Sequence, residues 1–295
     1  CKISTQTEIG IDQLRGVLLD KAATLKTRQT RGHFRMYVDR AFTKKGSGVV
    51  VTGTALSGEV DVGDELFLHS VSEHHARKTS VKVRNIHVQG DQALKGQAGQ
   101  RCALNLAGKI SIEHVRRGDI LFAGVDAVPT VRLDAGFQLA DDAPRPLKHM
   151  GRVKLNIGAR RIGARTYLLP GNGKSESENG RTRQRVQFIL DAGVLAFAGD
   201  RFLVREDNEQ RILGGGVIID PEASPWNKAN ADRVQILDAL EGNCVTKAFE
   251  KLLFEDGEII SRKRQQRIWN LTNSEIEHLL SARPFSSDNI VKTPN

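Results

Sequence analysis

Short β-type runs separated by glycine turns dominate residues 33–125 and constrain the fold more than any other feature. Glycine supplies the backbone angles that tight turns require, so each run predicts one strand. Gly63-Asp64 and Gly118-Asp119 each stand just before an apolar run, where such a turn is useful. Six strands of this kind predict a closed barrel or a sandwich. The six runs are FRMYVDRAF, GVVVTGTALSG, DELFLHS, SVKVRNIHVQG, QRCALNLAG and GDILFAG.

A second β-rich stretch follows at residues 129–221 and predicts a separate barrel. Within it, the polar, glycine-rich residues 170–181 predict an exposed hairpin loop. Beyond Pro221 the pattern becomes helical, with helices expected at 229–240, 247–254 and 274–280, and predicts a helix-turn-helix or winged-helix unit. The basic segment 261–267 in that region fits a solvated helix face or a nucleic-acid contact.

The first 25 residues predict one amphipathic helix, because apolar residues recur there at helical spacing. These residues are Ile9, Ile11, Leu14, Val17, Leu18 and Leu19. A single helix cannot bury such a stripe by itself, so we expect it to belong to a domain lying upstream. The predicted fold class is therefore mainly β: two consecutive barrels, preceded by a helix and followed by a helical region.

The charge balance favours a polyanionic partner. The chain of 295 residues carries 44 Lys and Arg against 35 Asp and Glu, a formal net charge of +9. Two Trp and two Tyr leave little for stacking on bases, which argues for recognition of phosphates and shape. No long apolar run and no signal-peptide pattern is present, so we expect a cytoplasmic monomer without a membrane partner. Three widely spaced cysteines predict reduced thiols.

No catalytic or metal-binding motif can be argued from spacing. Gly173-Lys174-Ser175 resembles the end of a phosphate-binding P-loop, but the first glycine of that motif would fall on Leu168. The adjacent histidines His74 and His75 point apart on an extended backbone, so a metal site there would need distant ligands. We therefore expect recognition chemistry, with no catalytic residues and no metal.

Arg40 is the first candidate recognition residue. By strand parity it shares a face with the apolar Phe34, Met36, Val38 and Phe42, where an unpaired charge is costly. It must lie at the rim, pair with Asp39 or meet an anionic ligand. Asp39 has the opposite parity, so the two charges converge only if the strand twists or bulges. Arg101 begins another strand, and the two arginines could form an anion pocket or be two surface arginines.

The second barrel carries a cluster of basic residues within 18 positions. Such a stripe fits contacts to phosphates, and a solvated hairpin is the alternative. Its members are Lys148, His149, Arg152, Lys154, Arg160, Arg161 and Arg165.

Several phrases resemble a known family when they are taken together. GSGVVVTGT, LSGEVDVGDEL, AGQRCALNLAG, RRGDIL, GDRFLVRE and GGGVIIDP occur in the order found in translational GTPases, and the sequence is most similar to the bacterial selenocysteine-specific elongation factor. The resemblance implies a remnant of the GTPase domain and linker at 1–28, the second-domain barrel at 29–126 and the third-domain barrel at 127–221. It also implies the start of a winged-helix region at 222–295. The chain would then be a fragment that lacks most of the GTPase domain and the last winged-helix modules.

The same resemblance implies a function for each candidate. Asp39, Arg40 and Arg101 match positions that line the selenocysteine pocket, and two arginines could separate an anionic selenolate from a neutral serine hydroxyl. The second barrel would contact the acceptor and T arms of the tRNA. Ser4 matches the loop beside the guanine base.

The partners implied are selenocysteinyl-tRNA, delivered to recoded UGA codons, the ribosome, and an mRNA insertion hairpin that only the missing modules would bind. GTP and Mg²⁺ would belong to the intact parent, and the fragment, lacking a P-loop, would hold no cofactor and hydrolyse no GTP by itself. Two alternatives stay open: the barrels of another translational GTPase, and a basic protein-interaction scaffold.

Overall fold

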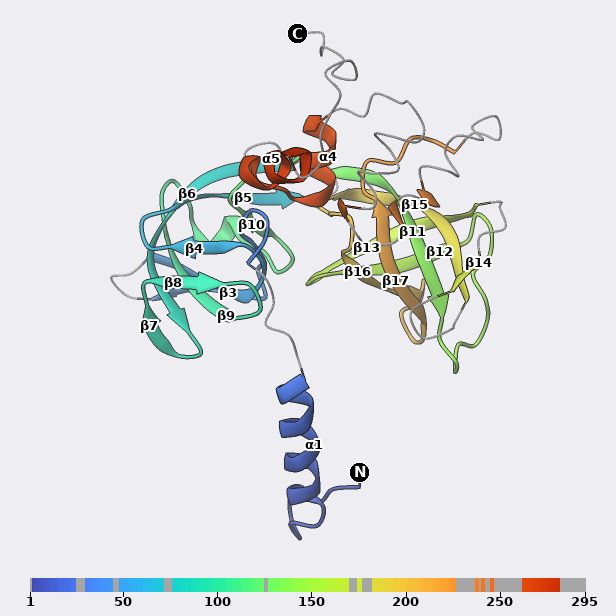
Figure 1. The fold of residues 1–295 in the computed structure, drawn as a ribbon, viewed down its shortest axis with the longest axis horizontal. Coiled ribbons are helices and arrows are strands. Elements are labelled where there is room, and N and C mark those ends of the chain that lie inside the picture. Colours follow the sequence, from blue (N-terminus) through green and yellow to red (C-terminus); the bar gives the residue numbers. More distant parts are fainter. Residues whose placement is uncertain are drawn as a thin grey trace.

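The chain folds into two antiparallel β-barrels that lie side by side, with helices at both ends of the sequence (Figure 1). The structure is a computed structural model. It describes residues 2–24, 30–44, 48–71, 76–124, 127–169, 174–176, 182–226, 237–238, 240–241, 245–246 and 262–281.

Barrel 1 is formed by one sheet with the strand order β1-β10-β5-β6-β9-β3-β2, and the pairing of β1 with β3 closes it. The predicted closed barrel is thereby confirmed. The strands are β1 (Arg35–Tyr37), β2 (Arg40–Lys44), β3 (Gly48–Ser57), β5 (Glu65–Val71), β6 (Ala76–Val88), β9 (Arg101–Ala107) and β10 (Ile120–Phe122). Three short strands lie outside this order: β7 (Asp91–Ala93) pairs with β6, and β4 (Glu59–Asp61) and β8 (Lys95–Gln97) form a separate two-stranded sheet.

Barrel 2 has the strand order β11-β17-β16-β12-β13-β15-β14, and the pairing of β11 with β15 closes it. The strands are β11 (Thr130–Leu139), β12 (Arg152–Ile157), β13 (Arg160–Leu168), β14 (Lys174–Glu176), β15 (Thr182–Val194), β16 (Arg201–Glu206) and β17 (Ile212–Asp220). Short β14 lies in the stretch predicted as an exposed hairpin loop, and it pairs with β15. The second predicted barrel is thus confirmed.

Each barrel has its own core because apolar and polar residues alternate along the strands. In β12, Val153, Leu155 and Ile157 are buried while the residues between them face outward. The core of barrel 1 is centred on Phe34, Met36, Val51, Leu104 and Leu121. The core of barrel 2 is centred on Leu133, Phe137, Leu155, Phe188 and Val204.

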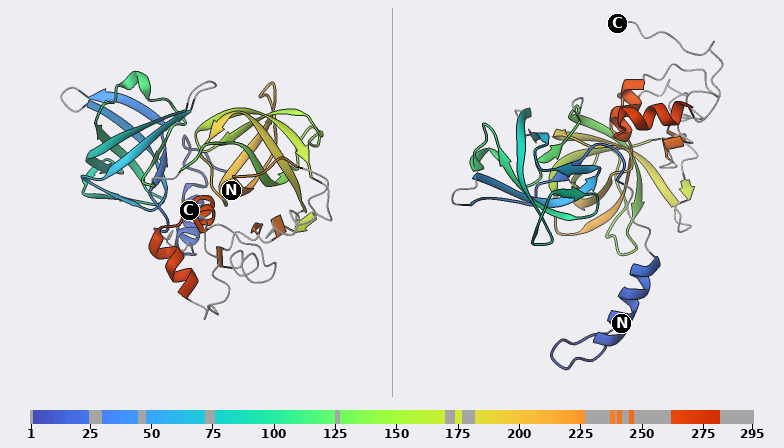
Figure 2. Two further views of the ribbon diagram at one scale, coloured as in Figure 1. Left: turned by 90° about the horizontal axis from the view of Figure 1, so that it is seen from above. Right: turned by 60° about the vertical axis from the view of Figure 1, so that its left-hand side comes forward.

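The two barrels lie next to each other (Figure 2), and residues of β1 and β10 contact barrel 2. Tyr37 and Ile120 of barrel 1 join the buried cluster of barrel 2. The Tyr37 hydroxyl donates a hydrogen bond to the carbonyl of Leu195 at 2.9 Å. A buried ion pair joins Arg35 to Asp200 at 2.7 Å. Both apolar contact and specific polar bonds therefore connect the barrels.

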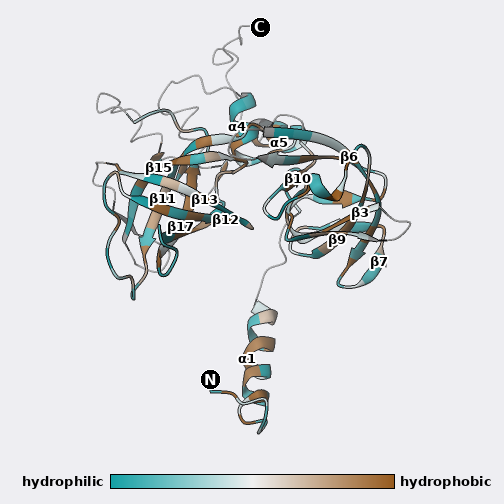
Figure 3. Ribbon diagram, turned by 180° about the vertical axis from the view of Figure 1, so that it is seen from behind, coloured by the Kyte–Doolittle hydropathy of each residue, from teal (hydrophilic) through white to brown (hydrophobic). Residues whose placement is uncertain are grey.

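Three α-helices and one short 3-10 helix are complete in the described part of the chain: α1 (Ile11–Thr24), η1 (Ile112–His114), α4 (Arg262–Trp269) and α5 (Asn273–Ser281). Helix α1 confirms the helix predicted within residues 1–25, and its stripe is exposed, with Leu19 at 64% (Figure 3). Helix α5 confirms the one predicted at 274–280. The helix predicted at 229–240 lies mostly outside the described residues, and the one predicted at 247–254 lies wholly outside them. Among the helices described, none has the length and apolar character to cross a membrane.

Candidate functional site

The chain between β1 and β2 forms a β-bulge. The run predicted as one strand is interrupted at Val38 and Asp39. The N–H of Asp39 donates to the carbonyl of Thr52 at 2.7 Å, and Arg40 is the register partner of the same Thr52. Two residues on one strand therefore oppose one residue on its neighbour, which is the definition of a bulge.

The bulge changes which side chains face the core. Val38 is fully buried and Ala41 packs against the core of barrel 1, so Asp39 and Arg40, which lie between them, are both outside it. The prediction that Arg40 shares the apolar face of Phe34 and Val38 is therefore wrong, because one extra residue shifts the alternation. Phe42 lies outside for the same reason and is 45% exposed. The condition for Asp39 and Arg40 to converge, a bulge in the strand, is met.

Arg101 completes this cluster from the first position of β9. Its Nη1 lies 2.7 Å from Oδ2 of Asp39. The Arg101 side chain is 53% exposed and that of Asp39 is 33% exposed, so the pair contributes at most about 1 kcal/mol. Such a weak pair leaves Arg101 able to bind an anionic ligand in place of Asp39. Arg40 is exposed and has no ion pair within the described part of the chain.

A groove lies beside the cluster on the outer face of barrel 1. It has a volume of about 540 Å³ and crosses β2, β3, β9 and β6. Oγ1 of Thr52 and Oδ1 of Asn105 are buried there, and neither has a hydrogen-bond partner among the described residues. A buried polar atom without a partner is costly, so both atoms are ready to bond a ligand. The lining residues are Phe42, Val50, Thr52, Asn85, His87, Gln89, Gly90, Arg101, Cys102, Ala103 and Asn105.

Sequence reasoning did not find Thr52, His87 or Asn105 as candidates. They come together only through strand register, which pairs Thr52 with Ala103, Ala103 with His87, and Asn105 with Asn85. A polar residue inside an apolar strand was a signal in the sequence, but its neighbours could not be assigned without the pairing.

The basic stripe of barrel 2 is partly neutralised. Arg152 and Arg165 are register partners on the outer face of β12 and β13. Arg152 forms two hydrogen bonds to Asp191, at 3.2 and 2.7 Å. Arg161 pairs with Glu209 and Lys154 approaches Asp207 at 3.8 Å. Arg165 is exposed and pairs with no acidic side chain within the described ranges. Its charge is therefore the most accessible of this stripe, which makes it the clearest candidate for an anion contact on this face.

The remaining candidates lie elsewhere. Arg160 sits against barrel 1, where a Cβ atom on Gly118 would come within 2.9 Å of its Cα. Burial lowers the pKa of Arg160, and Asp119 opposes that shift. Nδ1 of His149 accepts a hydrogen bond from the N–H of Leu168 at 3.2 Å, and Lys148 is exposed in the same turn. Ser4 accepts a hydrogen bond from the N–H of Thr7 in the loop before α1.

A second groove, of about 750 Å³, lies on the outer face of barrel 2 over the glycines of β17. Gly215 is required there, because a Cβ atom would lie 2.8 Å from the carbonyl oxygen of Phe202. Arg183 and Arg201 border the groove, and Nε of Arg183 has no hydrogen-bond partner in the described structure. The sequence did not point to Arg183 or Arg201. The glycines at 214–216 line the groove together with both arginines, but in the sequence they indicated only a strand.

Several comparisons with known proteins point to the same family. A family model described as "Selenocysteine-specific elongation factor, beta-barrel domain" matches residues 135–225. The selenocysteine-specific elongation factor of Escherichia coli is 33% identical over 231 residues, which are 78% of this chain and 34% of the relative. That of Haemophilus influenzae is 31% identical over 234 residues, which are 79% of this chain and 35% of the relative.

Solved structures share the fold. A bacterial selenocysteine-specific elongation factor, EF-Sec, superposes with a TM-score of 0.69 at 20% identity and covers 92% of this chain and 41% of that chain. The apo form of translation elongation factor SelB from Methanococcus maripaludis has a TM-score of 0.59 at 29% identity, covering 73% of this chain and 49% of that chain.

The two barrels and these likenesses place the chain in the class of translation elongation factors. The chain spans about a third of the length of the bacterial relatives that it matches. Within the class, it belongs to the selenocysteine-specific elongation factor family.

Proposed function

We propose that the chain binds selenocysteinyl-tRNA, as part of a GTP-dependent factor that delivers it to the ribosome at recoded UGA codons. The observation that carries the proposal is the bulge, which places Asp39 and Arg40 on the outer face beside Arg101. The cluster has two cations and one anion, and it borders a groove with two unpaired polar atoms. The groove would hold the uncharged part of the aminoacyl end, and the arginines would bind its side chain.

Charge is the basis of selection in this proposal. A selenol is much more acidic than a serine hydroxyl, so selenocysteine is an anion near neutral pH and serine is neutral. An ion pair at about 4 Å gains roughly 1 kcal/mol in water and about 4 kcal/mol at an effective dielectric of 20. Arg101 is about half exposed, so we expect a value toward the lower end, about 1–2 kcal/mol for each arginine. Because each 1.4 kcal/mol is about tenfold in affinity, the pair selects by roughly a hundredfold.

Barrel 2 would bind the body of the tRNA. Arg165, Arg183 and Arg201 support this role, because none of them has an ion pair with an acidic residue in the described part of the chain. Contacts of this kind are to phosphates, so they would not distinguish one aminoacyl group from another.

GTP and Mg²⁺ would be bound outside this chain's barrels. The sequence contains no complete P-loop, and Lys174 and Ser175 lie in β14, antiparallel to β15, without the strand-to-helix turn of a nucleotide site. We therefore assign no guanine-nucleotide site to the described residues of the barrels, and no step of the proposed binding uses one.

The test compares two tRNAs on three variants. Arg40→Ala and Arg101→Ala are each expected to weaken binding of selenocysteinyl-tRNA about tenfold and of seryl-tRNA less than about twofold. Arg165→Ala is the matched control, because it removes the same charge from barrel 2 and should weaken both tRNAs equally. Binding is measured in the factor with its GTPase domain present, at one fixed salt concentration.

Equal losses for both tRNAs in Arg40→Ala and Arg101→Ala would show that the arginines act on the tRNA backbone and not on the selenolate. A preference of the unsubstituted factor for ordinary elongator aminoacyl-tRNAs would contradict the assignment to selenocysteine altogether.

A further inference from the structure

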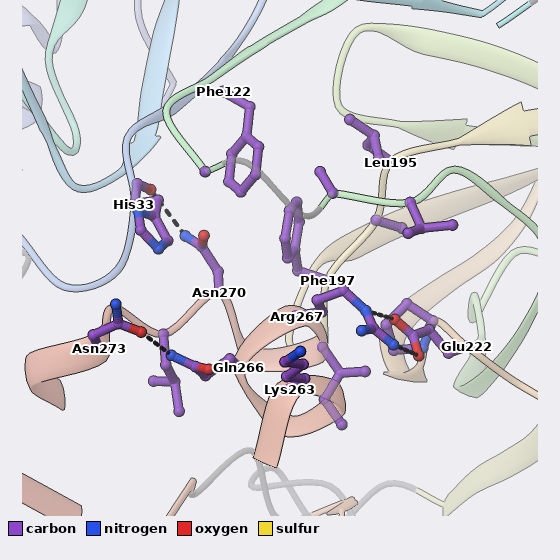
Figure 4. Close-up of a pocket in the computed structure, with 17 residues that line it drawn as sticks. His33, Phe122, Leu195, Phe197, Glu222, Lys263, Gln266, Arg267, Asn270 and Asn273 are labelled. Carbon is purple, nitrogen blue, oxygen red and sulfur yellow. Dashed lines mark hydrogen bonds and ion pairs between the residues drawn. The ribbon is translucent and has the colours of Figure 1, made fainter. Parts of the chain in front are cut away.

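A cavity of about 150 Å³ lies where the helical segment 262–281 meets the two barrels (Figure 4). Phe122 reaches it from β10 of barrel 1, Phe197 from barrel 2, and Asn270 from the turn between α4 and α5. Lys263 also lines the cavity and is exposed, so solvent reaches the cavity on that side. Small-molecule sites occur preferentially at such junctions between domains.

Two arginines bind the helical segment to barrel 2. Arg264 donates two hydrogen bonds to Asp220, at 2.9 and 2.8 Å. Arg267 donates two to Glu222, at 2.7 and 2.9 Å, so the charge of Arg267 is compensated where it lines the cavity. Paired bonds of this geometry fix orientation as well as distance. The basic segment at 261–267 is thus, at Arg264 and Arg267, bound to barrel 2 and not a solvated face.

The amide of Asn270 is oriented by barrel 1. Its Nδ2 donates hydrogen bonds to the carbonyl of His33, drawn in Figure 4, and to Oγ of Ser57, both at 2.9 Å. A carbonyl can only accept, so the nitrogen of the amide must face His33 and the oxygen must point away from it.

The oxygen of this amide lacks a partner. Oδ1 of Asn270 is buried, and among the described residues that line the cavity it is the one buried side-chain atom without a hydrogen bond. An unsatisfied buried acceptor is costly, so this oxygen is ready to accept a hydrogen bond from a molecule in the cavity.

Aromatic rings form the apolar part of the wall. The ring centres of Phe122 and Phe197 lie 5.5 Å apart with their planes at 44°, and the His33 ring lies 5.9 Å from Phe122 at 73°. Aromatic rings favour such tilted and edge-on contacts, so a further ring can join the group. Burial lowers the pKa of His33, and Glu275 opposes that shift, so the His33 ring is mostly neutral at pH 7. The wall therefore suits an uncharged ring.

We propose that the cavity binds a small neutral molecule with one aromatic ring and one hydroxyl or N–H group. The ring lies against Phe122 and Phe197, and the hydroxyl or N–H donates to Oδ1 of Asn270. An apolar cavity of about 150 Å³ is large enough to bind benzene, so the size suits one ring. A charged ligand is disfavoured, because Arg267 is already paired with Glu222 and an unpaired ion between apolar walls is costly. The proposal does not depend on the binding of any RNA.

The test compares phenol with toluene, which has a methyl group in place of the hydroxyl. Each is titrated into the 295-residue chain, and the backbone amides of Leu195, Phe197 and Leu271, which line the cavity, are followed by NMR. We expect saturable shifts for both ligands, with phenol bound at least as tightly as toluene. A hydroxyl buried without an acceptor would instead make phenol the weaker ligand.

Asn270→Gly tests the assigned acceptor. The φ of Asn270 is +56°, which glycine adopts without strain. We expect the ratio of phenol affinity to toluene affinity to fall at least about fivefold, because the hydroxyl loses its acceptor. A ratio is compared, so a change that weakens both ligands equally does not affect it. Met150→Gly is the matched control, because Met150 has φ +60°, is exposed and lies outside the cavity, so the ratio should not change.

Intermolecular NOEs locate the ligand without any substitution, and they decide the question if Asn270→Gly does not fold. We expect NOEs between the ring protons of phenol and both the methyl groups of Leu195 and the ring of Phe197. The absence of saturable shifts at the three amides up to about 10 mM phenol would overturn the proposal, as would NOEs to residues elsewhere. Toluene bound more tightly than phenol by the unsubstituted chain, or an unchanged ratio in Asn270→Gly, would refute the hydrogen bond to Asn270 and with it the class of ligand.

Discussion

Arg35 is a buried charge at the contact between the barrels, and its removal gives a sharp prediction. Its side chain is 11% exposed and that of Asp200 is 10% exposed. Two bonds of 2.7 and 2.8 Å join the two groups, and Nε of Arg35 donates to Oγ of Ser57 at 3.0 Å. The guanidinium also lies 4.5 Å from the centre of the Phe197 ring. Burial opposes the charge of Arg35, and Asp200 more than offsets it, so the pKa of Arg35 is raised.

Asp200→Ala leaves this guanidinium buried without its partner. Removing one member of a buried pair costs about 3–5 kcal/mol, whereas removing both members is often close to neutral. The N–H of Phe197 also loses its acceptor in this variant, which adds about 1 kcal/mol. We therefore expect Arg35→Met/Asp200→Ala to be more stable than Asp200→Ala alone, although it carries one more substitution.

The measurement is urea unfolding at pH 7 of the unsubstituted chain, Asp200→Ala, Arg35→Met and the double variant, followed by circular dichroism. The four free energies of unfolding form a double-mutant cycle, in which we expect a coupling of a few kcal/mol. A loss below about 1 kcal/mol in Asp200→Ala would show that the pair is screened like a surface pair. A double variant less stable than Asp200→Ala would refute the argument from an uncompensated charge.

Two further predictions concern buried polar groups of barrel 1. Tyr37→Phe removes the hydrogen bond to the buried carbonyl of Leu195 and should lower the free energy of unfolding by about 1–3 kcal/mol. Tyr167→Phe is the control, because the Tyr167 hydroxyl has no such bond in the described structure, and it should lower that free energy by less than about 0.5 kcal/mol. Burial and the nearby Lys78 lower the pKa of His69 from 6.5 to about 4. Between pH 6.5 and pH 4, His69 is therefore protonated in the unfolded chain and neutral in the folded chain. The free energy of unfolding consequently falls as the pH falls from about 6.5 toward 4. This pKa shift corresponds to a free energy of at most about 3 kcal/mol, which solvent screening reduces to about 2 kcal/mol. His69→Gln should remove this contribution, which is measured by urea unfolding at several pH values between 7.5 and 5.

The barrels could be predicted from the sequence because strand formation depends on a local pattern. Alternation in residues such as Val153 and Leu155, with glycine at the turns, determines which face is buried without knowledge of the partner strand. The same rule failed at Arg40. The bulge depends on how β1 pairs with β10 while β2 pairs with β3. Val38, just before the bulge, bonds to the segment that enters β10, donating its N–H to the carbonyl of Asp119 and accepting from the N–H of Gly118, whereas Arg40, just after it, pairs with Thr52 of β3.

The candidate site could be predicted only in part. Asp39, Arg40 and Arg101 were found through charge and resemblance, and the ion pair between Asp39 and Arg101 is present. Tertiary contacts decided which basic residues keep an accessible charge: Arg160 is directed to the barrel contact and Arg152 to Asp191. A sequence lists charges without their partners, so it could not separate these from Arg165. The role of each residue in binding tRNA stays a prediction.

The bulge makes the chemistry of the cluster depend on residue count as well as on residue type. Between the buried Val38 and the inward Ala41 stand two residues, where a regular strand would hold either one or three with alternating directions. Deletion of a single residue there would leave one outward charge and keep both flanking core contacts, so the fold would persist while the cluster lost a member. Among related sequences, a change in chain length at this point would therefore signal a change of ligand more clearly than a substitution would.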